Sequence, residues 1–176
     1  FLVRGINVGG RHKVVMEEFC HELKELGMSN VSSYINSGNF FFDSSLMKVE
    51  LLLVLERFLN KTYPFIKVFS LFTLEDYQNE VASLPKWWEN DFYRKDVLLY
   101  TERLDKNEMR NVIESLELGD EIIHLGQLGI YWGKFDKSSY NQTAYHKKLL
   151  KAPFYPSITI RNARTFSKIG QFLRMK

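Results

Sequence analysis

Hydrophobic positions in the first half of the chain change their spacing several times, and each change marks the border of a predicted element. Apolar residues at helical spacing, such as Met16, Phe19 and Leu23, predict a helix that Gly27 ends. Short β-rich runs on both sides of a Ser-Gly pair at 37–38 predict a hairpin. The predicted strands are 1–7, 31–36, 40–43 and 66–72, and the predicted helices are 16–26, 49–59 and 74–84.

The second half repeats this order of elements. Asp105 and Glu108 begin a helix that Gly119 stops, and a glycine-containing turn at 126–128 joins the next two strands. The predicted strands are 97–100, 121–125, 129–135 and 157–161, and the predicted helices are 105–116, 143–150 and 166–173. Corresponding elements are offset by about 90 residues, which we interpret as a structural duplication.

The order βαββαβ, followed by a further helix, is that of the ferredoxin-like split βαβ arrangement. We therefore predict an α+β protein of two tandem ferredoxin-like βαββαβ(α) subdomains, each with an antiparallel sheet and helices packed on one face. The predicted domains are residues 1–88 and 89–176. Trp87 and Trp88 lie in the linker, and two such large side chains favour halves that are docked together.

Composition places the chain among globular proteins. Apolar residues make up 45% of its 176 positions, the usual share for a protein with a packed core. No run approaches about 18 consecutive apolar residues, so no membrane span or membrane partner is expected. The opening Phe-Leu-Val-Arg-Gly has no features of a secretory signal, and a chain without an initial Met is expected to lack its own N-terminus. A single cysteine, Cys20, predicts a cytoplasmic location.

The net charge of +3 hides an uneven distribution of charge. Residues 134–176 contain ten Lys or Arg and one acid, Asp136, and residues 1–13 contain three bases and no acid. The segment between them, 14–133, carries eleven bases and twenty acids. Basic ends favour a basic face that meets an anionic partner, and a solvated lysine-rich surface explains the same counts equally well.

A glycine-rich turn with several bases follows the first predicted strand. Glycine lets backbone N–H groups approach a ligand closely, and the N-terminus of the next helix favours anions. The spacing matches neither a P-loop nor the dinucleotide-binding fingerprint. A tight turn with solvated bases is the alternative interpretation. The candidate anion-binding residues of this turn are Arg4, Asn7, Gly9, Gly10, Arg11 and Lys13.

A second candidate segment lies where the last predicted strand leads into the last helix. Asn162 is a favourable N-cap residue. Arg161, Arg164 and Lys168 stand near the helix N-terminus, where cations are unfavourable, and this conflict indicates an anionic partner or a buried carboxylate. The alternative is an arginine that holds the halves together through acids of the middle segment. The candidates are Arg161, Asn162, Arg164 and Thr165, and we expect them to share one anion site with the glycine-rich turn.

No pattern in the sequence identifies a metal site, a cofactor site or a catalytic pair. Cys20 and His21 lie on one predicted helix without a further ligand at metal spacing, and His124 and His146 have no partners in sequence. No nucleophile lies beside a recognisable base. We therefore expect neither a metal nor a cofactor, and the sequence leaves open whether the protein is an enzyme.

Several motifs resemble those of a bacterial family of unknown function, DUF1697. They are Arg-Gly-Ile-Asn-Val-Gly-Gly at 4–10, Ser-Gly-Asn at 37–39, Thr-Ile-Arg-Asn at 159–162 and Arg-Thr at 164–165. The resemblance covers nearly the whole chain. It implies a two-subdomain α+β fold and a bacterial cytosolic protein, and it implies no activity. The chain departs from the family at Ala163, where a Trp is common, and at 137–140, where a Ser-Lys pair is common.

Three hypotheses of function follow from the sequence. The first is a protein that binds a phosphate-bearing or other anionic ligand, or nucleic acid, through its basic N- and C-terminal motifs. The second is an enzyme that acts on a small anionic substrate in the cleft between the halves. The third is a non-catalytic interaction protein whose polar motifs are structural. Neither half contains the stacking motif of an RNA-recognition domain, and we favour the first hypothesis.

Overall fold

The computed structural model describes residues 1–174, and its strands form two four-stranded antiparallel sheets. The first half contains β1 (Leu2–Val3), α1 (Met16–Glu25), β2 (Ser29–Tyr34), β3 (Asn39–Asp43), α2 (Lys48–Thr62), β4 (Phe69–Ser70) and α3 (Leu74–Ser83). The second half contains η1 (Lys86–Glu89), β5 (Arg94–Tyr100), α4 (Lys106–Glu114), β6 (Glu121–Leu125), β7 (Gly129–Lys134), η2 (Tyr140–Gln142), α5 (Ala144–Lys147), η3 (Leu149–Lys151), η4 (Tyr155–Ser157), β8 (Ile158–Asn162) and α6 (Ala163–Arg174).

The two sheets have the same topology. The strand order is β2-β3-β1-β4 in the first sheet and β6-β7-β5-β8 in the second, so each strand has a counterpart at the same place in the other sheet. The molecule is thus built from two tandem ferredoxin-like subdomains, and the predicted α+β class and internal duplication are confirmed.

Side-chain caps fix the starts of several helices. The Thr73 side chain accepts a hydrogen bond from Asp76 N, and the Asp76 carboxylate accepts one from Thr73 N, so two backbone donors at the start of α3 are satisfied. Asp105 accepts hydrogen bonds from the backbone of Asn107 and Glu108 at the start of α4. These local interactions explain why the helices begin where the sequence predicts.

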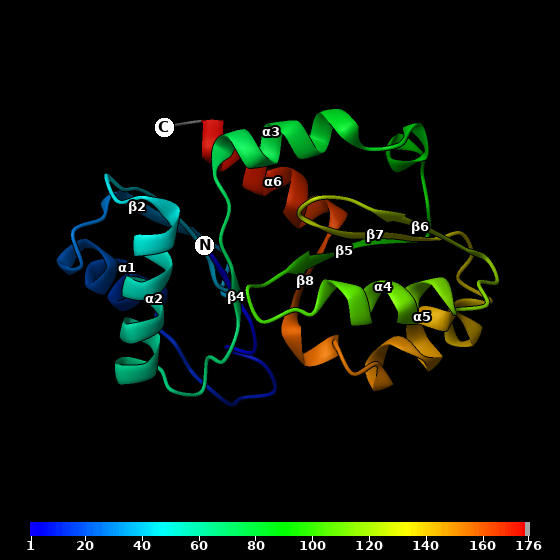
Figure 1. The fold of residues 1–176 in the computed structure, drawn as a ribbon, viewed down its shortest axis with the longest axis horizontal. Coiled ribbons are helices and arrows are strands. Elements are labelled where there is room, and N and C mark those ends of the chain that lie inside the picture. The colour runs from blue at the N-terminus through cyan, green and yellow to red at the C-terminus, as the bar shows by residue number, and fades with distance from the viewer. Residues whose placement is uncertain (175–176) are drawn as a thin grey trace.

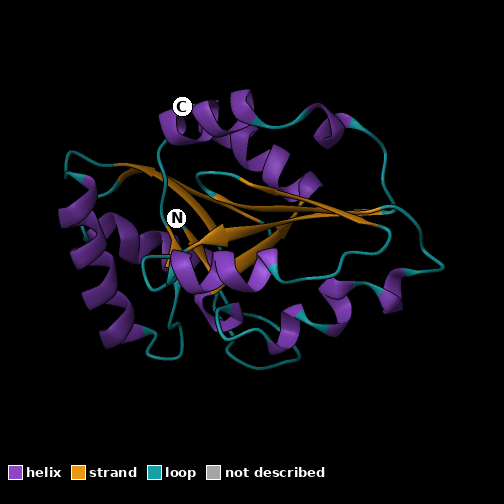
Figure 2. Cartoon of the chain, turned by 45° about the vertical axis from the view of Figure 1, so that its right-hand side comes forward, coloured by secondary structure: helices purple, strands orange, loops and turns teal. Residues whose placement is uncertain are grey.

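Each sheet carries helices on both faces, and the prediction of helices on one face only is wrong. One core packs the first sheet against α1 and α2, and a second core packs the other sheet against α4 and α5. A third core contains residues of α3, α6 and both sheets. Figure 1 shows α3 and α6 side by side above the second sheet, and Figure 2 shows the strands enclosed by helices. The last helix of each half supplies this extra layer.

The helices α3 and α6 each reach the sheet of the opposite half. The Phe172 ring of α6 lies 5.0 Å from the rings of both Tyr34 and Phe41, which belong to the first sheet. In α3, the buried Glu80 carboxylate accepts a hydrogen bond from Gln127 N in the β6–β7 turn at 2.9 Å. The two halves therefore share a core. The domain boundary between residues 88 and 89 lies inside η1 and stays a prediction.

A buried ion pair lies where β5 begins and β7 ends. Lys134 Nζ is 2.7 Å from Asp96 Oδ2, and neither side chain has exposed surface. Arg94 Nε lies 2.8 Å from the same oxygen, and Lys134 Nζ lies 3.3 Å from the centre of the Tyr145 ring. Burial lowers the pKa of Lys134 to about 8, although the nearby Asp96 charge opposes this shift.

This lowered pKa predicts that the protein becomes more stable as the pH rises from 8 to about 9.5. An unfolded lysine titrates near 10.4, so the unfolded chain binds more protons in this range, and the free energy of unfolding rises by up to about 1.4 kcal/mol per pH unit. Above this range, buried tyrosines such as Tyr145, whose pKa is raised by desolvation, act in the opposite direction. Urea denaturation at several pH values measures the slope.

The matched variants for this test are Lys134→Met and Lys137→Met. Lys137 is exposed on the segment that follows β7, so its replacement should leave the slope as it is in the parent protein. Lys134→Met removes the titrating group and should flatten the rise, while Arg94 still compensates the Asp96 charge. An undiminished slope in Lys134→Met would assign the effect to another group.

Candidate functional site

Two of the motif segments found in the sequence, 37–39 and 159–162, meet at the side chain of Arg161. Arg161 lies in β8, and its Nη2 donates hydrogen bonds to the carbonyls of Val3, Ser37 and Gly38 at 2.9, 2.9 and 3.2 Å. Its Nε donates to Asn39 Oδ1 at 2.6 Å. A residue of the second half therefore binds the end of β1 and the β2–β3 turn of the first half.

All three guanidinium nitrogens of Arg161 have partners inside the protein. Its Nη1 donates to Thr159 Oγ1 at 3.0 Å and to the Ile160 carbonyl at 2.9 Å. The residue is only 7% exposed, and desolvation lowers the pKa of its guanidinium to about 10. Arg161 thus holds the halves together, as one alternative from the sequence supposed, but through neutral oxygens in place of carboxylates. No nitrogen is left to face a ligand.

Arg4 makes the reciprocal connection from the first half to the second. Its Nη1 donates to the backbone carbonyls of Tyr155 and Ile158, the latter at 2.6 Å, and its guanidinium lies 4.5 Å from the centre of the Tyr155 ring. Like Arg161, Arg4 is therefore occupied with contacts between the halves.

Asn7 closes the glycine-rich loop. Its Nδ2 donates to the carbonyls of Val14 and Asn36 at 3.0 Å each, and its Oδ1 accepts from Val14 N at 2.9 Å. The backbone of Asn7 has a φ of 54°, a left-handed conformation that Asn tolerates better than most residues. Both the oxygen and the nitrogen of this amide therefore stabilise the loop.

The tip of the loop is a tight turn that projects into solvent. Arg11 N donates to the Val8 carbonyl at 3.1 Å, and Gly9 and Gly10 between them have φ values of 58° and 73°, where other residues would be strained. Arg11 is exposed. Helix α1 begins only at Met16, because the chain first returns along the loop, so the turn does not lead directly into a helix N-terminus.

The flank of the loop lies beside the segment that leads into β4. The His12 ring stacks on the Phe65 ring with 4.6 Å between their centres, and Arg4 N donates to the Val68 carbonyl at 3.3 Å. Lys13, next to His12, is exposed. The bases of the loop therefore border the residues from 65 to 68.

The C-terminal candidates have mixed roles. Asn162 Oδ1 accepts a hydrogen bond from Thr165 N at 2.8 Å and caps α6, as its residue type predicts. Thr165 is buried, whereas Arg164 is exposed in the first turn of α6. Of these three residues, only Arg164 presents a charged group to solvent.

The two predicted segments lie at opposite ends of β8. Arg4, which precedes the glycine-rich turn, binds the carbonyl of Ile158 at the start of β8, while Asn162 ends this strand and Arg164 follows it. Figure 1 shows the dark-blue loop after β1 at the lower edge of the molecule and α6 near the upper edge. We therefore treat the two segments as separate candidates.

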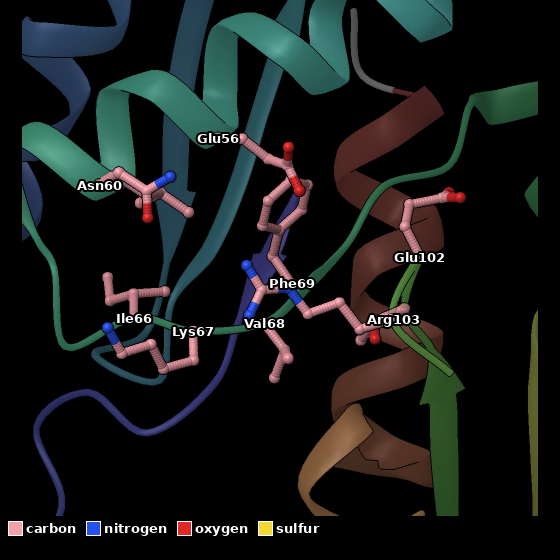
Figure 3. Close-up of a pocket in the computed structure, with 10 residues that line it drawn as sticks. Glu56, Asn60, Ile66, Lys67, Val68, Phe69, Glu102 and Arg103 are labelled. Atoms are coloured by element: carbon pink, nitrogen blue, oxygen red, sulfur yellow. The ribbon is translucent and has the colours of Figure 1, made fainter. Parts of the chain in front are cut away.

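A shallow hollow that opens to solvent, with a cavity volume of about 20 Å³, lies between the two halves, next to the glycine-rich loop. Its walls come from α2, from the segment that enters β4 and from the turn after β5. Figure 3 shows Arg103 extending from that turn toward the first half, while Glu102 beside it points away and Glu56 projects from α2. The lining side chains that carry charge or an amide are Glu56, Asn60, Lys67, Glu102 and Arg103.

Two hydrogen bonds hold the walls of this crevice in place. Ser70 Oγ, in β4, donates across the halves to the Tyr100 carbonyl at 2.6 Å, and Thr101 Oγ1 donates within the second half to the Ser157 carbonyl at 2.7 Å. In contrast, Lys67 and Arg103 are exposed and have neither a hydrogen bond nor an ion pair with any other described residue. The crevice thus combines a fixed frame with two unpaired cations.

No group of three or more His, Cys, Asp or Glu side chains within residues 1–174 is placed to hold a metal ion. None of the helices in the same range is long and apolar enough to cross a membrane. Cys20 is half-buried and is not part of a disulfide.

The fold defines a class of α+β proteins with tandem ferredoxin-like subdomains, and comparison with known proteins identifies the family. The model of the family described as "Protein of unknown function (DUF1697)" matches residues 1–131, and the chain belongs to this family. The solved structure of the conserved bacterial protein SP0830 from Streptococcus pneumoniae is 57% identical, covers 98% of this chain and 96% of that one, and has a TM-score of 0.96. No curated protein matches the chain.

Sequence reasoning did not single out Lys67 or Arg103. Both belong to the acid-rich middle segment, where the summed charge of 14–133 suggests an acidic surface. A signal was nevertheless present, because each base stands next to a border of a predicted element, and element borders are where functional side chains gather. Only the three-dimensional structure shows that these two bases, which come from different halves, line the same hollow.

The hydrogen bonds of Arg161 predict how the protein responds to a conservative substitution. Arg161→Lys keeps a positive charge but loses the planar fork, so several buried carbonyls lose their donor, and the free energy of unfolding should fall by about 2–4 kcal/mol. Arg164→Lys is the matched control, because Arg164 is exposed and its replacement should change stability by less than about 0.5 kcal/mol. Equal stabilities of the two variants in urea denaturation would refute the role of Arg161.

Proposed function

We propose that the protein binds a phosphate-bearing or other anionic ligand in the crevice between its halves. The observation that supports this proposal is the pair of exposed, unpaired cations, Lys67 from the first half and Arg103 from the second, at one hollow. The planar fork of an arginine suits two-point contact with a phosphate, and a lysine adds a second charge. A ligand held by both residues would contact both halves.

The acidic and amide groups of the crevice narrow the class of ligand. Glu56 and Asn60 lie on the α2 wall, and the Glu56 carboxylate repels a bare anion there. A ligand that also carries hydroxyl or amino groups can donate hydrogen bonds to these oxygens. A phosphate ester with a polar body, such as a mononucleotide, therefore fits the lining better than inorganic phosphate.

The glycine-rich loop extends this proposed site. Arg11 and Lys13 are exposed, and the loop borders the segment that contributes Lys67. Gly9 and Gly10 keep the tip of the loop free of side chains, so backbone N–H groups are open to an approaching anion. We propose that these residues add a second, weaker contact at the rim of the crevice.

A binding function is preferred here to a catalytic one. No hydrogen bond within residues 1–174 joins a hydroxyl or thiol group to a histidine ring, and such a contact is the usual mark of an activated nucleophile. The contacts of Arg4 and Arg161 also support a structural role for part of the motifs. An enzyme in the cleft remains the alternative, and turnover of a bound phosphate ester would favour it.

The proposal predicts that removing either cation weakens binding of a nucleoside diphosphate. One lost charge-assisted hydrogen bond contributes about 1.5–3 kcal/mol, so Arg103→Ala should raise the Kd by roughly 10- to 150-fold, and Lys67→Ala should raise it by a smaller factor. Isothermal titration calorimetry with ADP and with pyrophosphate measures both the affinity and the preference for a polar body.

The control for this test is Lys24→Ala, which removes an equally exposed base from the last turn of α1. It changes the net charge by the same amount and should leave the Kd unchanged. If all three variants bind with equal affinity, the attraction is diffuse and the crevice is not the site. The absence of binding at millimolar ligand would reject the proposal as a whole.

A further inference from the structure

Exposed aromatic rings gather at the end of the second sheet, away from the crevice. Tyr93 precedes β5 and is 47% exposed, and Phe135 follows β7 and is 51% exposed. The crevice adjoins the other end of β5, at Thr101. In Figure 1 this aromatic end lies at the right-hand side, where β5 begins and the loop after β7 leaves the sheet.

Each of these rings is held by the sheet and by a different neighbouring ring. Tyr93 N donates to the Phe135 carbonyl at 3.4 Å, so the antiparallel pairing of β5 and β7 continues to these two residues. The Phe135 ring centre lies 4.6 Å from that of Phe92, and the Tyr93 ring centre lies 5.6 Å from that of Tyr140. Exposed rings on a fixed frame lose little conformational entropy when a flat ligand covers them.

Cations stand beside the exposed rings. Arg94 is oriented by its contact with the buried Asp96, and its guanidinium lies 5.9 Å from the centre of the Tyr140 ring with almost half of the side chain exposed. Lys137 is exposed in the segment after Phe135. The carboxylate of Asp136, which lies between Phe135 and Lys137 in sequence, accepts two hydrogen bonds from Ser138 and is directed into that turn.

We propose that this aromatic end, formed by Tyr93, Arg94, Phe135 and Lys137, binds single-stranded nucleic acid. Two unpaired bases stack on Phe135 and Tyr93, and the phosphates that flank them contact Arg94 and Lys137. Alternation of aromatic and cationic side chains matches a strand in which flat bases alternate with phosphates. The inference uses a different surface from the proposed function and shares with it only the phosphate chemistry of the ligand.

The chemistry of the surface excludes a duplex as the preferred ligand. Bases in a double helix stack on one another, so their faces are not available to Phe135 or Tyr93. A duplex offers this surface only its phosphates, which contact the cations alone. A neutral polysaccharide would contact the rings and form no ion pair with the cations, so its binding would not depend on salt.

The experiment is a fluorescence-anisotropy titration of the full chain with labelled oligothymidylate and oligouridylate, about 12 nucleotides long, at several salt concentrations. The log of the affinity should fall linearly with log salt, with a slope of about −0.7 per neutralised phosphate. Phe135→Ala should raise the Kd about tenfold or more, and Tyr93→Ala should do the same. Phe135→Trp retains a stacking face and should keep the parent affinity.

Val49→Ala is the matched control, because Val49 is 69% exposed on α2 and its loss should leave binding unchanged. Thermal unfolding checks that every variant is folded. Equal affinity of Phe135→Ala and the parent chain, or equal affinity for a duplex of the same length, overturns the proposal. No binding of any oligonucleotide at low salt overturns it as well, and calorimetry with ADP then shows whether the crevice still binds its own ligand.

Discussion

The guanidinium of Arg161 lies between the two sheets, almost closed off from solvent, and donates hydrogen bonds to both halves. A charge in a nearly closed space must be compensated by hydrogen bonds, and each of its nitrogens donates at least one. The acceptors belong to both halves, so a shift of one sheet against the other would break several charge-assisted bonds together. Arg4 makes the same kind of connection in the opposite direction, which leaves the halves with little freedom to slide.

The hydrogen bonds of Arg161 form a joint between the halves, and this joint limits which residues fit around it. Gly38 has a φ of 78°, and a Cβ at that position would lie 2.3 Å from Val3 Cγ2, so no other residue fits without a shift of the chain. Its carbonyl must face Arg161 at the same time. Helices α3 and α6 each contact the opposite half. The alignment of the two halves therefore also determines how the aromatic rings of the shared core pack. The crevice inherits its geometry from this joint, since Ser70 of the first half donates across it to the Tyr100 carbonyl.

The sequence predicted the element order well, because strand and helix periodicities are local. It overestimated β4, which spans only Phe69–Ser70, since the residues before it line the crevice and do not pair along the sheet. It also overestimated α5, where Glu121 binds the backbone of the first turn and the chain then tightens into η3.

The role of Arg161 was only one of several alternatives from the sequence. Three of its six acceptors are backbone carbonyls more than 120 residues away. A carbonyl is present at every position, so no residue type in the sequence indicates such a partner. The unpaired cations of the crevice were concealed for a different reason. Charge summed over a long segment averages Lys67 and Arg103 with many acids, while binding depends on the few charges at one place.

Strand β5 determines how the two proposed sites relate to each other. It spans Arg94–Tyr100 and pairs with β7 on one side and β8 on the other, so it is a central strand that cannot shorten or bend freely. Seven residues at about 3.3 Å each separate the aromatic end from the crevice by roughly 23 Å. That separation is too great for one mononucleotide. Ligand binding at one site therefore does not alter the affinity of the other unless β5 changes its conformation. A coupling free energy between two sites requires a shared element with two states.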